Sequence, residues 1–146
     1  MKKIKTFLLV DDNNSTNFFN KTIIQKTESV EEVLIAKNGA EAIEYIRSGV
    51  IPEVIFLDIN MPVMNGWEFL DTYRKLNNTS EKTIIILMIG TELAEEDIEK
   101  ARNMVEIKEF RDKMLTKEIV CDIISTYFEN INSVLCSKSK SLTSQM

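Results

Sequence analysis

The sequence lacks histidine entirely and carries no excess of positive charge. Without histidine, a Ser/His/Asp triad, a zinc site built on imidazole and a self-phosphorylating histidine are all excluded. Any acid–base or metal chemistry must therefore use carboxylates, lysine, hydroxyl groups and the backbone. The formal net charge of −5 disfavours nucleic acid as a direct partner, because phosphate backbones require a basic face.

Cysteine is scarce, and long apolar runs are absent. Cys121 and Cys136 carry no spacing typical of a metal site, and we expect both to be reduced and without a role. No apolar run approaches the roughly 20 residues that a membrane span requires. Behind the basic amino terminus, the apolar stretch runs only from Phe7 to Val10. That is too short for a signal peptide, so we expect a cytoplasmic protein.

Apolar runs of strand length alternate with helical patterns along the chain. We expect strands at residues 5–10, 32–36, 54–57, 83–88 and 107–111, and helices at 15–27, 40–48, 67–76, 92–103 and 116–132. This alternation predicts an α/β fold with a doubly wound, five-stranded parallel sheet in the order 2-1-3-4-5 and five helices, flavodoxin-like. Residues 1–132 would form this domain, and residues 133–146 a short disordered tail.

The helix expected over residues 15–27 has an apolar stripe. Phe19, Ile23 and Ile24 recur at helical spacing, which predicts that they face the core. Phe18 falls off this stripe, and it is either an exposed apolar contact or a partly buried residue at the helix edge. Asn14 or Ser15 is expected to cap the helix.

Charged residues follow three of the expected strands. Asp11 and Asp12 come directly after the first strand, Asp58 directly after the third, and Lys113 after the weaker fifth. In the predicted sheet the first and third strands are neighbours, and ligands bind at the carboxyl edge of such sheets. We therefore expect three carboxylates and one ammonium to meet in one pocket.

Such a pocket is suited to a hard cation and a phosphoryl group. Each pair of carboxylates repels by on the order of 4 kcal/mol at about 4 Å, so a cation is expected to offset the cluster. Mg²⁺ prefers oxygen ligands, and aspartate is an established covalent phosphoryl acceptor. Taken singly, the aspartates are typical of turns and the lysine of a solvated surface. The prediction rests on finding all four in order on the correct elements.

Three motifs resemble the response-regulator receiver domain of bacterial two-component signalling, and the resemblance extends from Lys5 to Ile131. The motifs are LLVDDN at residues 8–13, IFLDINMPVMNG at 55–66 and FRDK at 110–113. The resemblance implies that Asp58 is the phosphoacceptor and that Lys113 contacts the phosphoryl group. It also implies a Mg²⁺ site with Asp12 and Asp58 as direct ligands, the Asn60 backbone carbonyl as a further ligand and Asp11 in the outer shell.

The sequence departs from the family pattern near the switch residues. Met88 stands where the family usually has Thr or Ser, and a thioether cannot donate a hydrogen bond to a phosphoryl oxygen. Thr91 would substitute only in a different register. Ile89 takes the place of a small residue and is expected to crowd the path of attacking water, so we predict slow hydrolysis of the phosphorylated form.

Two further departures flank Lys113. Met114 replaces a proline that is often preceded by a cis bond, and we expect a trans or strained loop here. Asp112 is placed to compete for Lys113. Phe110 keeps the family's switch aromatic, so a rotamer switch is still expected at that position.

The resemblance implies a histidine kinase or a histidine phosphotransfer protein as donor, docking on the helix at residues 15–27. A downstream protein or a second copy would bind the surface of residues 92–132. We favour a stand-alone phosphoacceptor with at most slow self-dephosphorylation. One alternative is a pseudo-receiver with a constitutive protein-binding role, supported by Met88 and Met114. A small phosphohydrolase is a minor alternative, because Asn60 replaces the second acid that such enzymes need.

Overall fold

The computed structural model describes residues 3–90, 94–129, 131 and 136. Within these residues, strands and helices alternate as β1 (Ile4–Val10), α1 (Asn14–Lys26), β2 (Val30–Ala36), α2 (Gly39–Arg47), β3 (Val54–Leu57), α3 (Gly66–Arg74), β4 (Ile84–Ile89), α4 (Glu95–Arg102), β5 (Ile107–Asp112) and α5 (Lys117–Tyr127). The order of elements predicted from the sequence is confirmed, with boundaries displaced by a few residues.

The five strands form one parallel sheet in the order β2-β1-β3-β4-β5, as predicted. β1 lies between β2 and β3, and its last residue, Val10, pairs with Ala36 on one side and Leu57 on the other. Leu57 in turn pairs with Leu87 of β4. The carboxyl ends of β1 and β3 are therefore level and adjacent, so residues that follow them are held side by side.

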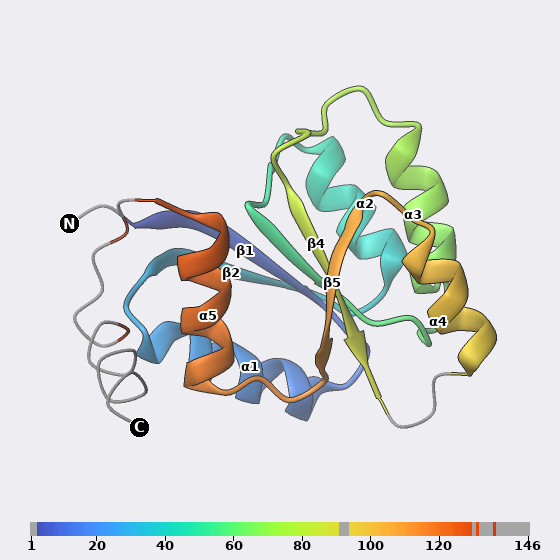
Figure 1. The fold of residues 1–146 in the computed structure, drawn as a ribbon. Helices are drawn as coiled ribbons and strands as arrows, with labels where there is room; N and C mark the ends of the chain where they lie inside the picture. Colours follow the sequence, from blue (N-terminus) through green and yellow to red (C-terminus); the bar gives the residue numbers. More distant parts are fainter. Residues whose placement is uncertain (1–2, 91–93, 130, 132–135, 137–146) are drawn as a thin grey trace.

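Helices cover both faces of the sheet, with α1 and α5 on one face and α2, α3 and α4 on the other (Figure 1). Successive residues of β1 alternate between the two resulting cores: Phe7 and Leu9 pack toward α1 and α5, and Leu8 and Val10 toward the other helices. This alternation follows from the period of two in a strand. Because both faces are buried, the central strands are continuous apolar runs.

The predicted apolar stripe of α1 is wrong at Phe19, whose side chain is 40% exposed. The buried residues of this helix are Asn17, Asn20 and Ile24, which recur at helical spacing on the inner face. Asn17 and Asn20, rather than Phe19, therefore share the buried face of α1 with Ile24. The side chain of Phe18 is 74% exposed, so of the two alternatives for this residue the exposed one is correct.

Three helices begin with side-chain caps immediately after the segments that carry the charged residues. Asn13 caps α1 rather than Asn14 or Ser15, and its Oδ1 accepts a hydrogen bond from the Thr16 amide at 2.9 Å. Asn65 caps α3, and Thr116 caps α5. Caps of this kind fix where each helix starts, and so fix the short segments between strand ends and helices.

The last helix of the predicted domain is shorter than expected, and residues 130 and 132 lie outside the described residues. α5 ends at Tyr127, before the predicted end at residue 132, because Phe128 has extended backbone angles. The tail predicted over residues 133–146 lies outside the described residues except at Cys136. Among the helices described, none combines the length and apolar character needed to cross a membrane.

The expectation that both cysteines are reduced is wrong in this structure. Cys121 of α5 and Cys136 form a disulfide, with their Cα atoms 5.3 Å apart. That separation lies in the usual range for bridged cysteines. A spacing of 15 residues excludes the common metal motifs but says nothing of whether two cysteines meet in space, which is why the sequence did not reveal the pair.

Candidate functional site

Three carboxylates gather at the carboxyl edge of the sheet. Asp11 and Asp12 directly follow β1, and Asp58 directly follows β3. The Asp58 amide donates a hydrogen bond to the Val10 carbonyl at 2.9 Å, which ties the two strand ends together. One carboxylate oxygen of each aspartate lies within 4.8 Å of the other two. The predicted cluster is thus formed by the adjacency of two strands whose residues are distant in sequence.

The three carboxylates differ in their surroundings. Asp58 and Asp11 are buried, at 4% and 6% exposure, and Asp12 is exposed. Asp11 Oδ1 accepts a hydrogen bond from the Asn13 amide, and Asp58 Oδ1 accepts one from the Ile59 amide, each at 2.9 Å. Asp58 Oδ2 is buried and is the one buried side-chain oxygen or nitrogen without a hydrogen bond among the described residues. A buried carboxylate oxygen of this kind is unstable unless a ligand or cation contacts it.

Among the described residues, the one ion pair made by this cluster is that of Asp58 with Lys113. Its Nζ lies 3.3 Å from Asp58 Oδ2, close enough for ionic attraction but without hydrogen-bond alignment. Burial opposes the charge of Lys113, but the attraction of Asp58 and Asp11 outweighs burial and raises the pKa of the lysine. Lys113 is therefore a fixed positive charge beside Asp58.

The electrostatics of the cluster favour a further cation. Burial, reinforced by repulsion from Asp11, raises the pKa of Asp58 to about 6, against the attraction of Lys113. Burial likewise raises the pKa of Asp11. Three carboxylates and one ammonium leave a formal charge of −2 when all are ionised. A divalent cation with a preference for oxygen ligands matches both this charge and the donor set.

Gly66 allows α3 to begin directly against the end of β3. A Cβ atom at this position would lie 2.6 Å from the Asp58 carbonyl oxygen and 2.9 Å from Ile59 Cα. The Gly66 amide also donates to the Ile59 carbonyl at 2.8 Å. Because backbone atoms cannot yield as a flexible side chain can, any larger residue would push α3 away from Asp58. The glycine of the Asn65-Gly66 pair is thus a requirement of close approach.

The loop between Asp58 and α3 makes a tight reversal. Val63 has a φ of 64° and is 83% exposed, and the Met64 amide donates to the Pro62 carbonyl at 2.6 Å. Positive φ is costly for a β-branched residue, so the rest of the loop must hold this turn in place. Asn60, whose carbonyl was predicted as a metal ligand, lies at the start of this loop and is exposed.

The residues predicted near the switch lie around β4 and β5. Met88 is 5% exposed and packs into the core under α1 and α5. Gly90, which directly follows β4, lies next to Lys113. A Cβ atom at position 90 would be 3.6 Å from Lys113 Cδ. Neither residue carries a hydroxyl. Thr91, the substitute considered from the sequence, lies outside the described residues, and Phe110 is half-buried against the core of α2, α3 and α4.

The loop that follows β5 is trans throughout its described peptide bonds, as expected for a loop with Met114 in place of proline. Met114 is 47% exposed. The ion pair of Lys113 is made with Asp58, and the described residues show none between Lys113 and Asp112. In this structure Asp112 therefore does not compete with Asp58 for the Lys113 ammonium.

Two asparagines near the site were missed from the sequence. Asn17 donates from Nδ2 to the Asp11 carbonyl at 2.7 Å, and Asn20 contacts the backbone on both sides of Met114. Both lie on the inner face of α1. Their spacing of three residues was the available signal, because two amides on one buried face need backbone partners.

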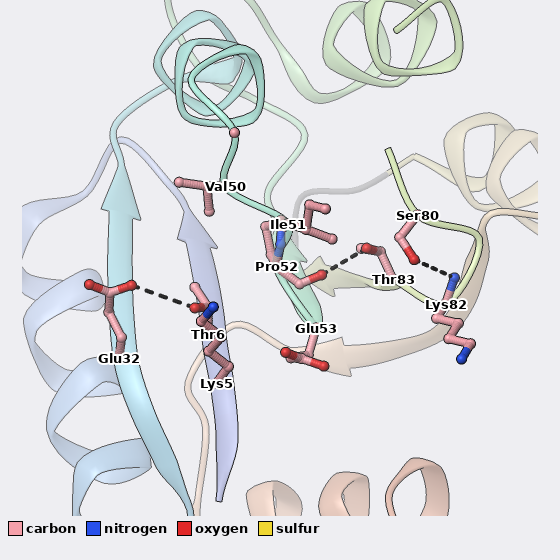
Figure 2. A pocket seen from close by; sticks show the side chains of 11 residues that line it. Lys5, Thr6, Glu32, Val50, Ile51, Pro52, Glu53, Ser80, Lys82 and Thr83 are labelled. Atoms are coloured by element: carbon pink, nitrogen blue, oxygen red, sulfur yellow. Dashed lines mark hydrogen bonds between the residues drawn. The ribbon is translucent and has the colours of Figure 1, made fainter. Parts of the chain in front are cut away.

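A hollow of about 410 Å³ lies at the opposite end of the sheet (Figure 2). Its walls include Lys5 and Thr6 at the start of β1, Glu53 just before β3 and Thr83 just before β4. The Thr83 hydroxyl donates to the Pro52 carbonyl at 2.7 Å. Since the carboxylates follow the other ends of these strands, the hollow is no part of the carboxylate site.

Comparisons with known proteins agree on one family. The family model for the response regulator receiver domain matches residues 7–125. A protein-glutamate methylesterase/protein-glutamine glutaminase of Burkholderia thailandensis is 37% identical over 100 residues, which are 68% of this chain and 26% of that protein. The chain spans 26% to 38% of the length of the first curated relatives that it matches.

Solved structures give the same result. A two-component response regulator from Cytophaga hutchinsonii has a TM-score of 0.73 at 31% identity, covering 86% of this chain and 98% of that one. Chemotaxis protein CheY4 of Vibrio cholerae has a TM-score of 0.70 at 26% identity, covering 86% of this chain and 99% of that one.

Proposed function

The chain belongs to the response regulator receiver domain family, and on this premise we propose that residues 1–132 form a phosphoacceptor module of a two-component phosphorelay. Asp58 receives the phosphoryl group from a phosphohistidine of another protein, since this chain has no histidine. The donor is a histidine kinase or a histidine phosphotransfer protein in the cytoplasm. The chain itself contributes at most slow self-dephosphorylation.

One observation carries this proposal. Asp58 Oδ2 is buried without a hydrogen bond, lies 3.3 Å from the Lys113 ammonium and shares its pocket with Asp11 and Asp12. A purely structural carboxylate would be expected to have its buried oxygen satisfied by a hydrogen bond. A carboxylate oxygen that contacts an ammonium and accepts no hydrogen bond is available as a nucleophile.

The carboxylate cluster fits Mg²⁺. Asp12 and Asp58 would be its direct protein ligands, with the Asn60 carbonyl as a further ligand and Asp11 in the outer shell. The exposure of Asp12 leaves room for the water ligands that Mg²⁺ usually keeps. When bound, the cation neutralises charge on the phosphoryl oxygens and on the carboxylates around them.

The transfer step forms one bond and breaks one. Asp58 Oδ2 attacks phosphorus with a lone pair, and the P–N bond of the donor phosphohistidine breaks with its electron pair passing to the imidazole, which takes a proton from solvent. Lys113 holds its positive charge against the phosphoryl oxygens through the transfer. Hydrolysis later breaks the new P–O bond by attack of water on phosphorus and restores the carboxylate.

The donor would dock on α1 beside the site. Phe18 and Phe19 are exposed there at 74% and 40%, and Met114 is 47% exposed on the loop after β5. Exposed apolar side chains beside a reactive group are suited to a protein partner. A downstream protein or a second copy would bind the surface of α4, β5 and α5.

A pseudo-receiver that binds partners constitutively is the second candidate. Of the two methionines that supported it in the sequence, Met88 packs into the core under α1 and α5. The support that remains is Met114 and the lack of a hydroxyl at Gly90, beside Lys113, because a switch needs contacts that differ between the two phosphorylation states. The presence of all four charged residues in one pocket weighs against it.

Intact-mass analysis after incubation with a small phosphodonor tests the proposal. With Mg²⁺, wild-type protein is expected to gain one phosphoryl group, and it should gain none with a chelator or in Asp58→Asn. Asp71→Asn, an exposed aspartate on α3, is the matched control and should be labelled like wild type. If small donors and histidine-phosphorylated donor proteins both fail to label wild type, the pseudo-receiver becomes the better assignment.

The phosphorylated form is expected to be long-lived. Ile89 is half-buried at the end of β4 and is proposed to obstruct attacking water. Ile89→Ala should therefore shorten the half-life of the phosphoryl adduct several-fold, measured by intact mass over time after removal of the donor. Ile51→Ala, at the distant hollow, serves as control. Equal half-lives in wild type and Ile89→Ala would contradict the obstruction.

A further inference from the structure

The face of α1 that packs on the sheet carries two buried asparagine side chains, whose amide groups need hydrogen-bond partners there. Asn17 is 2% exposed and Asn20 is 4% exposed. Burying an amide without hydrogen-bond partners destabilises the folded state. Both side chains form hydrogen bonds to backbone groups of other segments rather than to one another.

Asn20 bridges the backbone on both sides of Met114. Its Nδ2 donates to the Lys113 carbonyl at 2.9 Å, and its Oδ1 accepts from the Leu115 amide at 2.9 Å. These contacts span 93 and 95 positions of sequence. One side chain therefore fixes both a donor and an acceptor of a loop that comes from the other end of the chain.

The loop held by Asn20 has no regular structure of its own. The ladder between β4 and β5 ends at the pair of Ile89 with Asp112, so Lys113 is the first residue beyond it. α5 begins only at Lys117, behind the cap at Thr116. Since Lys113 lies between two regular elements, its backbone position depends on contacts such as the two from Asn20.

Asn17 makes the equivalent contact on the other side of the site. Its Nδ2 donates to the Asp11 carbonyl at 2.7 Å, next to the turn that carries Asp12. Asn17 and Asn20 lie one helical turn apart on the same face. The same rigid helix thus holds the segment that bears the carboxylates and the segment that bears the ammonium.

We propose that Asn20 is the positioning residue for Lys113: by clamping the loop after β5 to α1, it sets where the ammonium stands relative to Asp58. The inference rests on the proposed function, since the consequence of misplacing Lys113 is read in phosphoryl transfer to Asp58. Asn20 touches neither carboxylate nor phosphoryl group and acts only through the lysine. Met114, between the two bonded residues, remains free to face solvent.

A double-mutant cycle on phosphorylation rate tests this role. Asn20→Leu keeps the number and branching of the side-chain heavy atoms and removes both hydrogen bonds. A displaced catalytic group can cost up to about a hundredfold in rate, and we expect a fall of about tenfold for Asn20→Leu. In a Lys113→Ala background the same substitution should change the rate by less than about twofold, because the group that it positions is gone.

Two further measurements separate positioning from general destabilisation. Ile24→Val weakens the buried face of the same helix without touching the loop and should leave the rate close to that of wild type at equal folded fraction. In Asn20→Leu, hydrogen exchange of the Leu115 amide should accelerate more than that of amides in β1. Equal rate effects of Asn20→Leu with and without Lys113 would overturn the inference while leaving the proposed function intact. A wild-type protein that is never labelled at Asp58 would overturn both.

Discussion

Asp58→Asn is expected to make the protein more stable at pH 7.5 when divalent cations are absent. Burial and the repulsion of Asp11 raise the pKa of Asp58 from 3.8 to about 6. The ionised carboxylate therefore destabilises the folded state, by about 3 kcal/mol at 1.36 kcal/mol per pKa unit. Replacing it with a neutral side chain of the same shape should recover about 2–3 kcal/mol.

The sign of this effect sets its pH window. Because the pKa of Asp58 is higher in the folded state, the carboxyl binds protons more tightly there than in the unfolded chain. Below about pH 3.8 the group is protonated in both states and costs nothing. The cost grows as pH rises to about 6 and is complete above it. The advantage of Asp58→Asn should therefore be present at pH 7.5 and disappear in acid.

Thermal or urea unfolding of both proteins in a chelator measures the difference. A gain of about 2–3 kcal/mol corresponds to a rise in Tm on the order of 5–10 °C for a domain of this size. Mg²⁺ should narrow the gap by binding the folded wild type more tightly than the variant. Asp71→Asn, which removes an exposed carboxylate, controls for the change in net charge. A variant less stable than wild type at pH 7.5 without cations would contradict the raised pKa.

Mg²⁺ affinity is expected to fall about tenfold between pH 7.5 and pH 5. A cation and a proton compete for the same carboxylate, and the metal binds only the ionised form. With the pKa of Asp58 at about 6, roughly one molecule in eleven is ionised at pH 5, against nearly all at pH 7.5. The raised pKa of Asp11 acts in the same direction.

Isothermal titration with Mg²⁺ at a series of pH values provides the measurement. Trp67, the single tryptophan, directly follows Gly66 at the start of α3 and offers a fluorescence signal from beside the site. Proton release on binding should be greatest near pH 6 and small at pH 8. An affinity that changes by less than about twofold across this range would show that Asp58 is already ionised at pH 5.

The sequence was sufficient for the sheet and for its charged edge. Continuous apolar runs can be buried only with both faces covered, which makes a parallel sheet between helices the consistent solution. The strand order then puts the ends of β1 and β3 together, and Asp11, Asp12 and Asp58 follow from their positions alone. Lys113 was predicted in the same way, from its place behind β5.

Local patterns failed where long-range contacts outweigh them. Helical spacing assigned Phe19 to the core of α1, but the inner face belongs to Asn17 and Asn20 because backbone groups of distant loops satisfy their amides. The pairing of Cys121 with Cys136 likewise depends on where the chain passes in space. No pattern within one segment contains the partner that another segment brings.

What the sequence by itself determined is the fold and the identity of the four charged residues, since periodicity and strand ends are properties of short segments. Only the tertiary structure decided that Asp58 Oδ2 is left without a hydrogen bond, that burial raises the pKa of its carboxyl, and that Asn20 clamps the loop of Lys113. Burial and hydrogen bonding between distant segments are set by packing. They therefore exist only once the helices are seated on the sheet.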